Sequence, residues 1–132
     1  MIVAAMRSPG GASAAILRAV RRERAVLLLS VPLAMEYEAV CLRPEHQIAA
    51  GLREQEVHIF VAAVIAMAEP VKIHFLWRPQ LRDPGDEMVL ETAVNGRADL
   101  LVTLNERDYG TVAERFGIQV TTPRRAMERI GK

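Results

Sequence analysis

The sequence predicts an α/β fold in which a parallel sheet is covered by helices on both faces. Two short runs, Ala25–Leu29 and Asp99–Thr103, are dominated by apolar residues, as is typical of parallel strands buried on both faces. Segments with apolar residues at helical spacing alternate with these runs. Such alternation is typical of right-handed βαβ units and of a sheet enclosed between two layers of helices.

Length and composition predict one globular domain over residues 1–132, since 51% of the residues are hydrophobic and 25% are charged. No apolar run is long enough for a membrane helix, and the first residues, MIVAAMRSPGG, lack the features of a signal peptide. The single cysteine, Cys41, excludes an internal disulfide and a cysteine-based zinc site, and we expect it in the core. We therefore expect a cytoplasmic protein with no membrane association.

The helices are recognised from apolar spacing and from their end signals. Asp83-Pro84-Gly85-Asp86 places acids and a proline ahead of apolar residues at helical spacing, which is a helix start, and Asn95-Gly96 ends that helix. Arg43-Pro44 stops the helix that follows Ser30, and Thr121-Thr122-Pro123 opens the last helix. The predicted helices cover residues 12–22, 31–42, 45–52, 54–68, 83–95, 106–116 and 123–130.

Two further strands are predicted at Val71–Ile73 and Ile118–Val120, and residues 74–82 are expected to be irregular, with Trp77 as a packing residue. The helix over 54–68 is expected to turn one apolar face inward, made of Val57, Phe60, Val61, Val64 and Ile65. This helix has two alternative roles, as part of the core or as an interface between two copies of the chain.

The net charge of +1 conceals an uneven distribution. Fifteen of the 17 basic residues are arginine; Arg7–Arg24 holds five arginines and one glutamate, whereas Asp83–Asp108 holds seven acids and two arginines. Such segregation is compatible with a cation site and a phosphate-binding surface. The alternative is that both segments are ordinary solvated helix faces, and charge by itself favours that interpretation.

In parallel sheets of this kind, binding sites form beyond the carboxyl ends of the strands. This rule selects the polar residues that follow predicted strands, Ser30, Thr103 and Asn105. Acids from separate elements that meet at this edge would repel one another unless a hard divalent cation such as Mg²⁺ lay between them. A cation held in this way activates water for attack on a phosphodiester. The candidate acids are Glu36, Asp83, Asp86 and Asp108.

Each candidate acid also has a purely structural interpretation. Asp83 and Asp86 would stabilise the N-terminus of the following helix through its dipole, Asp108 would cap the next helix, and Glu36 would face solvent. The three histidines are scattered without ligand spacing, which argues against a histidine-based metal site.

Four segments in order resemble PIN-domain proteins: SPGGASAAILRAV, LLLSVPLAMEYEAVCLRP, RDPGDEMVLETAVNGRADLLVTLNERDYG and FGIQVTTPRRAME. The resemblance covers nearly the whole chain and is greatest to VapC-like ribonucleases, the toxins of bacterial toxin–antitoxin pairs. It implies a three-layer α/β/α sandwich with a central parallel sheet. It also implies an Mg²⁺- or Mn²⁺-dependent endoribonuclease whose cation is held by three or four acids.

The resemblance assigns roles to individual residues. Glu36 matches the family's second acid and Asp86 the third, while Asp108 matches the acid of the variant T-x-N-x-x-D-[FY]. These three residues would hold the metal and support catalysis. The resemblance places Asp83, Thr103 and Asn105 beside them as supporting residues, with Asn105 where many relatives carry another aspartate.

The chain departs from the family at its beginning. The family's first acid lies in an N-terminal strand that ends in Asp-Thr-Asn, and Met1–Met6 begins where that motif has just ended. The first strand is therefore expected to be truncated, because either the true start lies upstream or the chain is shortened.

The expected partners follow from this resemblance and from charge. With a complete site, the chain would be the ribonuclease toxin of a toxin–antitoxin pair. With an incomplete site, it would be a module that binds an antitoxin or RNA without cleaving, or a non-catalytic member of a dimer. A homodimer is expected, and charge alone suggests that the residues contacting RNA phosphates are Arg18, Arg22 and Arg124.

Overall fold

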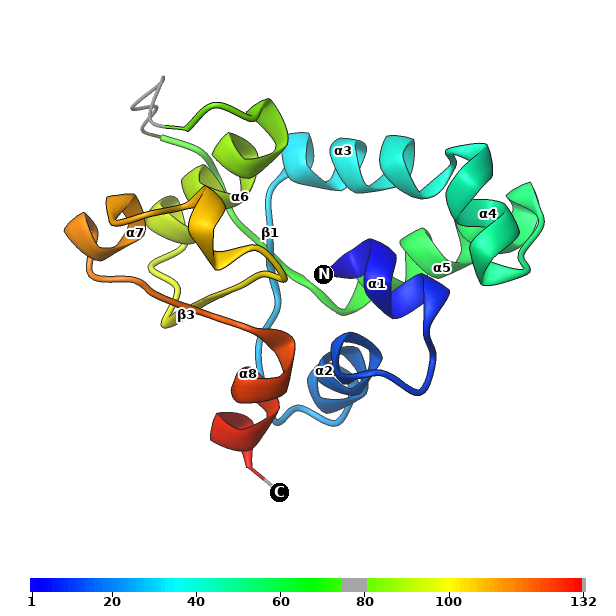
Figure 1. The fold of residues 1–132 in the computed structure, drawn as a ribbon, viewed down its shortest axis with the longest axis horizontal. Coiled ribbons are helices and arrows are strands. Elements are labelled where there is room, and N and C mark those ends of the chain that lie inside the picture. Colours follow the sequence, from blue (N-terminus) through cyan, green and yellow to red (C-terminus); the bar gives the residue numbers. More distant parts are fainter. Residues whose placement is uncertain (75–80, 132) are drawn as a thin grey trace.

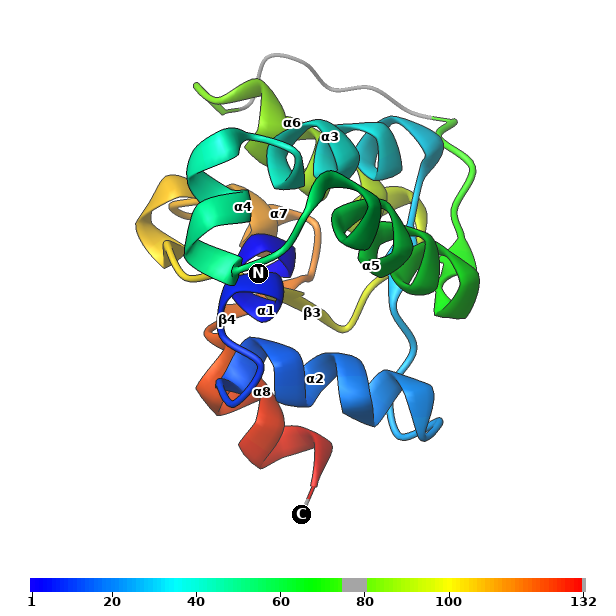
Figure 2. The same ribbon diagram turned by 90° about the vertical axis from the view of Figure 1, so that its right-hand side faces the viewer.

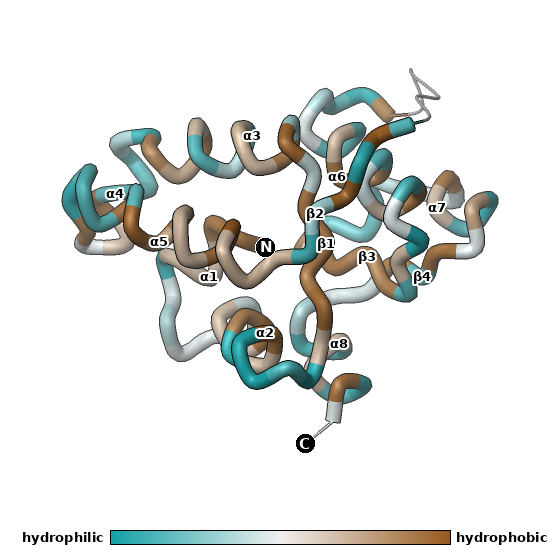
Figure 3. The backbone as a smooth tube through the Cα atoms, turned by 180° about the vertical axis from the view of Figure 1, so that it is seen from behind, coloured by the Kyte–Doolittle hydropathy of each residue, from teal (hydrophilic) through white to brown (hydrophobic). Residues whose placement is uncertain are grey.

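The computed structural model describes residues 1–74 and 81–131. Trp77, which was expected to be a packing residue, lies outside the described residues. The elements are α1 (Ile2–Arg7), α2 (Ala12–Arg21), β1 (Leu28–Leu29), α3 (Val31–Cys41), α4 (Pro44–Ala50), α5 (Glu54–Met67), β2 (Glu69–Pro70), α6 (Pro84–Asn95), β3 (Leu100–Val102), the 3₁₀ turn η1 (Glu106–Asp108), α7 (Val112–Arg115), β4 (Gln119–Thr121) and α8 (Pro123–Ile130). Helices surround the short strands, which run through the middle of the molecule (Figures 1 and 3).

The strands form two separate parallel pairs. β1 pairs with β2 through Leu28 opposite Glu69, and β3 pairs with β4 through Leu100 opposite Gln119. The α/β class and the parallel pairing agree with prediction. However, the described residues do not form the single central sheet of a three-layer sandwich.

The first strand implied by the family resemblance is not among the described elements, because Ile2–Arg7 form α1. Ile2, Ala5 and Met6 are buried, and their spacing of three and one residues places them on one helical face. The segment therefore packs as a helix against α2, α3 and α5.

Several predicted bounds need correction. The strand expected over Ala25–Leu29 is confined to Leu28–Leu29, and Val26 is 70% exposed. The strand expected at Val71–Ile73 lies earlier, at Glu69–Pro70. The amides of Glu69 and Val71 donate to the carbonyls of Leu27 and Leu29 at 2.8 and 2.9 Å. Pro70 lies between them with its nitrogen directed away from β1, a position where a missing N–H is tolerated.

The helix expected over residues 106–116 is broken into η1 and α7. Gly110, between them, has a φ of 52°, in the left-handed region that favours glycine and interrupts a right-handed helix. The predicted start of the last helix is confirmed, since the Thr122 hydroxyl accepts a hydrogen bond from the Arg125 amide.

Within the described residues, three hydrophobic clusters hold the elements together. The first joins α1, α2, α3 and α5 around Cys41 and Val57, both 0% exposed, which confirms Cys41 as a core residue. The second lies under α6, β3 and α7, and the third joins α2 to α8. On α5, Val57, Val61 and Val64 are buried as predicted, but Ile65 is 44% exposed. Among the described residues, no helix is both long and apolar enough to span a membrane.

Gly96, at the end of α6, allows that helix to pack closely on β1. A Cβ atom at this position would lie 2.8 Å from Leu28 Cδ1 and from Val71 Cγ2. We expect Gly96→Ala to lower the free energy of unfolding by about 1–3 kcal/mol, because both side chains must move to admit the methyl group. Urea denaturation measures the loss. Gly10→Ala is the matched control, since a Cβ there meets no atom within 4 Å; equal stability of the two variants would contradict the prediction.

Candidate functional site

A chain of buried hydroxyl groups joins the start of α3 to the middle of α6. The Ser30 and Thr92 hydroxyl oxygens are 2.7 Å apart, and the Thr92 hydroxyl donates to the Met88 carbonyl at 2.8 Å. Because Thr92 uses its proton in that bond, Ser30 must donate to Thr92. Ser30 also caps α3 by accepting from the Leu33 amide at 3.4 Å. These bonds set α3, which carries Glu36, beside α6.

The N-terminus of α6 gathers carboxylates from two parts of the chain. Asp83 caps the helix, and its Oδ1 accepts from the amides of Gly85 and Asp86 at 2.7 and 3.3 Å. A Cβ atom on Gly85 would lie 3.0 Å from this oxygen and 3.5 Å from Oε1 of Glu36. Glu36 and Asp83 therefore approach the same backbone position, where the helix dipole favours negative charge.

Asp86 lies where these acids meet the segment after β3. The buried Tyr109 donates its hydroxyl hydrogen to Oδ1 of Asp86 at 3.4 Å. Burial raises the pKa of Asp86, the charges of Asp83 and Asp108 raise that pKa further, and the Tyr109 bond opposes the rise. The pKa of Tyr109 is likewise raised, first by burial and then by the negative charge of Asp86. The structure thus brings Asp83 and Asp108 within electrostatic reach of Asp86.

The other predicted site residues lie in different settings. The Thr103 hydroxyl accepts from the Asn105 amide at 3.1 Å, a local turn bond, and no carboxylate bond to Thr103 is seen in the described residues. Arg18, Arg22 and Arg124 are exposed at the end of the molecule that carries α2 and α8. They are not brought to the acids at the start of α6 (Figures 1 and 2).

Carboxylate oxygens are the donors that Mg²⁺ and Mn²⁺ prefer, and the charge of a cation would relieve the repulsion that raises the pKa of Asp86. The donor chemistry therefore fits a hard divalent cation. In residues 1–74 and 81–131, no three acid, histidine or cysteine side chains lie close enough together to hold one. The acids are gathered at one helix end without forming a closed ligand set.

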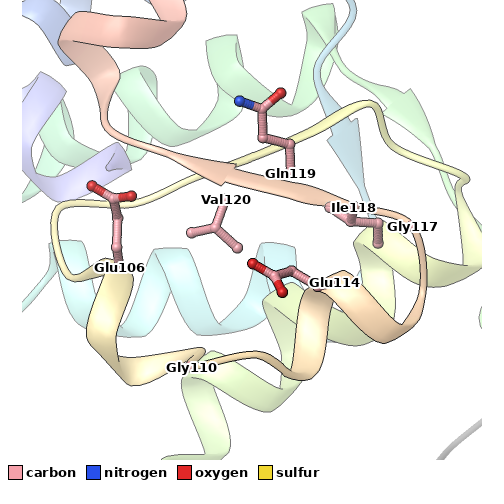
Figure 4. A pocket seen from close by; sticks show the side chains of 7 residues that line it. All are labelled: Glu106, Gly110, Glu114, Gly117, Ile118, Gln119 and Val120. Atoms are coloured by element: carbon pink, nitrogen blue, oxygen red, sulfur yellow. The ribbon is translucent and has the colours of Figure 1, made fainter.

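A hollow of about 390 Å³ lies between β4 and the segment formed by η1 and α7. Ile118, Gln119 and Val120 line one side of it, and the carboxylates of Glu106 and Glu114 stand on the other (Figure 4). None of the predicted metal ligands lines this hollow. It is a separate feature from the acids at the start of α6.

Thr92 and Tyr109 were not singled out from the sequence. Thr92 lies within a helix, where nothing in the local pattern indicates a hydroxyl bond to Ser30, 62 positions away. Tyr109 directly follows Asp108, so a search for polar partners beside the acids would have found it.

The chain matches a family model described as PIN domain over residues 1–107. That range includes Glu36, Asp83 and Asp86 and ends one residue before Asp108. No curated protein and no solved structure matches the chain.

The Ser30–Thr92 bond predicts non-additive effects of substitution. We expect Ser30→Ala and Thr92→Val each to lower the free energy of unfolding by about 1–3 kcal/mol, because each leaves a buried hydroxyl without its partner or removes a helix cap. The double variant should lose less than the sum of the two, which a thermodynamic cycle from urea denaturation measures. Additive losses would show that the two hydroxyls do not act together.

The raised pKa of Asp86 predicts a stability effect that depends on pH. A carboxyl group with a higher pKa in the folded chain binds its proton more tightly there. Its contribution thus favours folding at low pH and is lost as pH rises through the folded pKa. We expect Asp86→Asn to raise the melting temperature relative to the parent chain, by an amount that grows from about pH 3 to pH 7. The exposed Glu38→Gln is the control; a difference that stays constant with pH would contradict this expectation.

Proposed function

The chain belongs to the PIN-domain family, and from that membership we propose that it is a metal-dependent endoribonuclease acting as the toxin of a toxin–antitoxin pair. PIN domains are commonly nucleases and typically use divalent metals. The observation that carries the proposal is the convergence of Glu36 and Asp83 at the start of α6, beside Asp86.

Glu36, Asp86 and Asp108 are the residues proposed to hold Mg²⁺ or Mn²⁺. A cation held there would offset the charge of the carboxylates and would supply an activated water for hydrolysis of the RNA phosphodiester. Tyr109 orients Asp86 through its hydroxyl hydrogen. Asp83 holds the first turn of α6 in place by accepting from the Gly85 amide. Thr103 and Asn105 shape the turn that leads from β3 to Asp108.

The proposed partners are RNA, an antitoxin and a second copy of the chain, all in the cytoplasm. On α5, Val57, Val61 and Val64 belong to the core of the chain, so only Ile59 and Ile65, 70% and 44% exposed, are left as apolar side chains that a second copy could cover.

A second candidate function is a catalytically impaired module that binds an antitoxin or RNA without cleaving it. The supporting observation is that no three acidic side chains among the described residues approach to metal-holding distance. In that case the carboxylates would bind a divalent cation weakly or not at all.

Substitution of the carboxylates tests the nuclease proposal. We expect Asp86→Asn and Glu36→Gln each to reduce Mg²⁺-dependent RNA cleavage by about 100-fold or more, because each removes a proposed metal ligand. Cleavage of a labelled RNA is measured with Mg²⁺ and with EDTA, and circular dichroism confirms folding. Glu38→Gln, two positions from Glu36, should cleave as the parent chain does.

Cleavage by Asp86→Asn at the parent rate would refute the proposed ligand set. A parent chain that binds RNA or an antitoxin in the presence of Mg²⁺ but leaves the RNA intact would favour the second candidate.

A further inference from the structure

The arginine surface is formed by two helices that are distant in sequence. α2 and α8 lie side by side in both views (Figures 1 and 2), joined by the buried side chains of Ile16, Val20 and Ala126. The arginines on these helices and on the turn after α2 are all exposed. We define the arginine surface as Arg18, Arg21, Arg22, Arg24, Arg124, Arg125 and Arg129.

The helical period explains why these residues gather on the outside. On α2, Arg18 and Arg21 are separated by three residues and are exposed, while Ile16, Leu17 and Val20 are buried. On α8, Arg124 and Arg125 precede the inward Ala126. Figure 3 shows hydrophilic residues at the C-terminal end of α2 and along α8.

Few acids offset these charges. Only Glu23 and Glu128 accompany the seven arginines in residues 12–24 and 122–131. The ion pairs seen within the described ranges are Arg53–Glu56 and His58–Glu54, and neither involves the arginine surface. Arg18 donates to the Pro9 carbonyl at 2.9 Å and Arg129 to the Gln119 side chain, both of which are neutral acceptors. The guanidinium charges therefore remain available to an anionic ligand.

We propose that the arginine surface binds the phosphate backbone of a nucleic acid strand. Guanidinium groups bind phosphate through paired, charge-assisted hydrogen bonds, and they keep their charge at any physiological pH. Seven such groups, five on two adjacent helices and two on the turn after α2, match a ligand with repeated anionic charges rather than one phosphate. None of the exposed large hydrophobic residues lies on α2 or α8, so these two helices lack the apolar anchors of a typical protein interface; Val26, two positions after Arg24, is 70% exposed.

This surface is distinct from the proposed cleavage site. The start of α6 and α3 lie at the top of Figures 1 and 2, whereas α2 and α8 lie at the bottom. One phosphate cannot contact both ends of the molecule, so the arginine surface holds a part of the strand away from the acids. The inference does not depend on cleavage, since phosphate binding by arginine needs no divalent cation.

Salt-dependent binding tests the proposal. A fluorescently labelled single-stranded RNA is titrated with the full chain in EDTA, and fluorescence anisotropy gives the affinity at several salt concentrations. We expect the double variant Arg21→Gln, Arg125→Gln to weaken binding about tenfold or more at low salt. The slope of log affinity against log salt should fall by about 1.4, since each lost phosphate contact on a single strand accounts for about 0.7. The matched control is Arg43→Gln with Arg115→Gln, which removes two exposed arginines elsewhere and should bind nearly as the parent does.

An unchanged affinity and slope in the first variant would overturn the proposal, as would an equal loss in the control. A poly-glutamate peptide is titrated in parallel at matched charge. Tighter binding of that peptide than of RNA, abolished by the same two substitutions, would assign the surface to an acidic protein and overturn the proposal. Because the titration is made in EDTA, it does not depend on metal-dependent cleavage, so a failure of the proposed nuclease function would leave this test unaffected.

Discussion

The start of α3 is held against the middle of α6 by the hydroxyl groups of Ser30 and Thr92. Glu36 lies on α3 and Asp86 on α6, so the spacing of these two candidate acids depends on this buried bond. Ser30 directly follows β1 in the chain, and its side chain caps α3 and donates to Thr92 on α6. This one residue therefore connects three elements. A scaffold of this kind is needed because carboxylates that approach one another do not hold themselves together.

The acids at the start of α6 have opposite effects on the stability of the fold. Asp83 contributes to stability by capping the helix, whereas the pKa of Asp86 is raised by burial and by its acidic neighbours. The bond from Tyr109 compensates only in part. Proteins tolerate such local costs where function requires the residues, and a cation between the carboxylates would reverse the sign of the interaction. The purely structural interpretation explains Asp83, but it does not explain why Glu36 approaches from another helix.

Charge is divided between the two ends of the molecule, although the net charge is only +1. Acids gather around the start of α6, while arginines cover α2 and α8. A polyanion would be attracted to the arginine end and repelled from the carboxylate end unless a cation neutralised the acids. If the chain binds nucleic acid as proposed, this division would orient the strand before any specific contact forms. It also explains why Arg18, Arg22 and Arg124, chosen for RNA binding on charge alone, belong to a surface separate from the proposed cleavage site.

Local signals in the sequence were sufficient to predict the α/β class, the helix start at Asp83-Pro84 and the helix start at Thr122-Pro123. They succeed because caps and helical spacing act between residues a few positions apart. Strand lengths were not predictable in the same way, because a strand extends only as far as a partner pairs with it. Ala25–Leu29 contains five residues of strand character, yet β2 pairs with only two of them. The division into two parallel pairs likewise depends on which strands meet.

At the candidate site, the sequence identified the candidate acids and the placement of Asp83 and Asp86 at a helix start, since these follow from motif and cap. Only the tertiary structure decided that Glu36 reaches Gly85, that Tyr109 bonds to Asp86, and that Thr92 supports Ser30. These contacts join residues between 23 and 62 positions apart. The sequence by itself therefore determined which acids are the candidates. The packing of α3 on α6 decided which of them meet, because contacts at such separations depend on the folded arrangement of whole helices rather than on any local pattern.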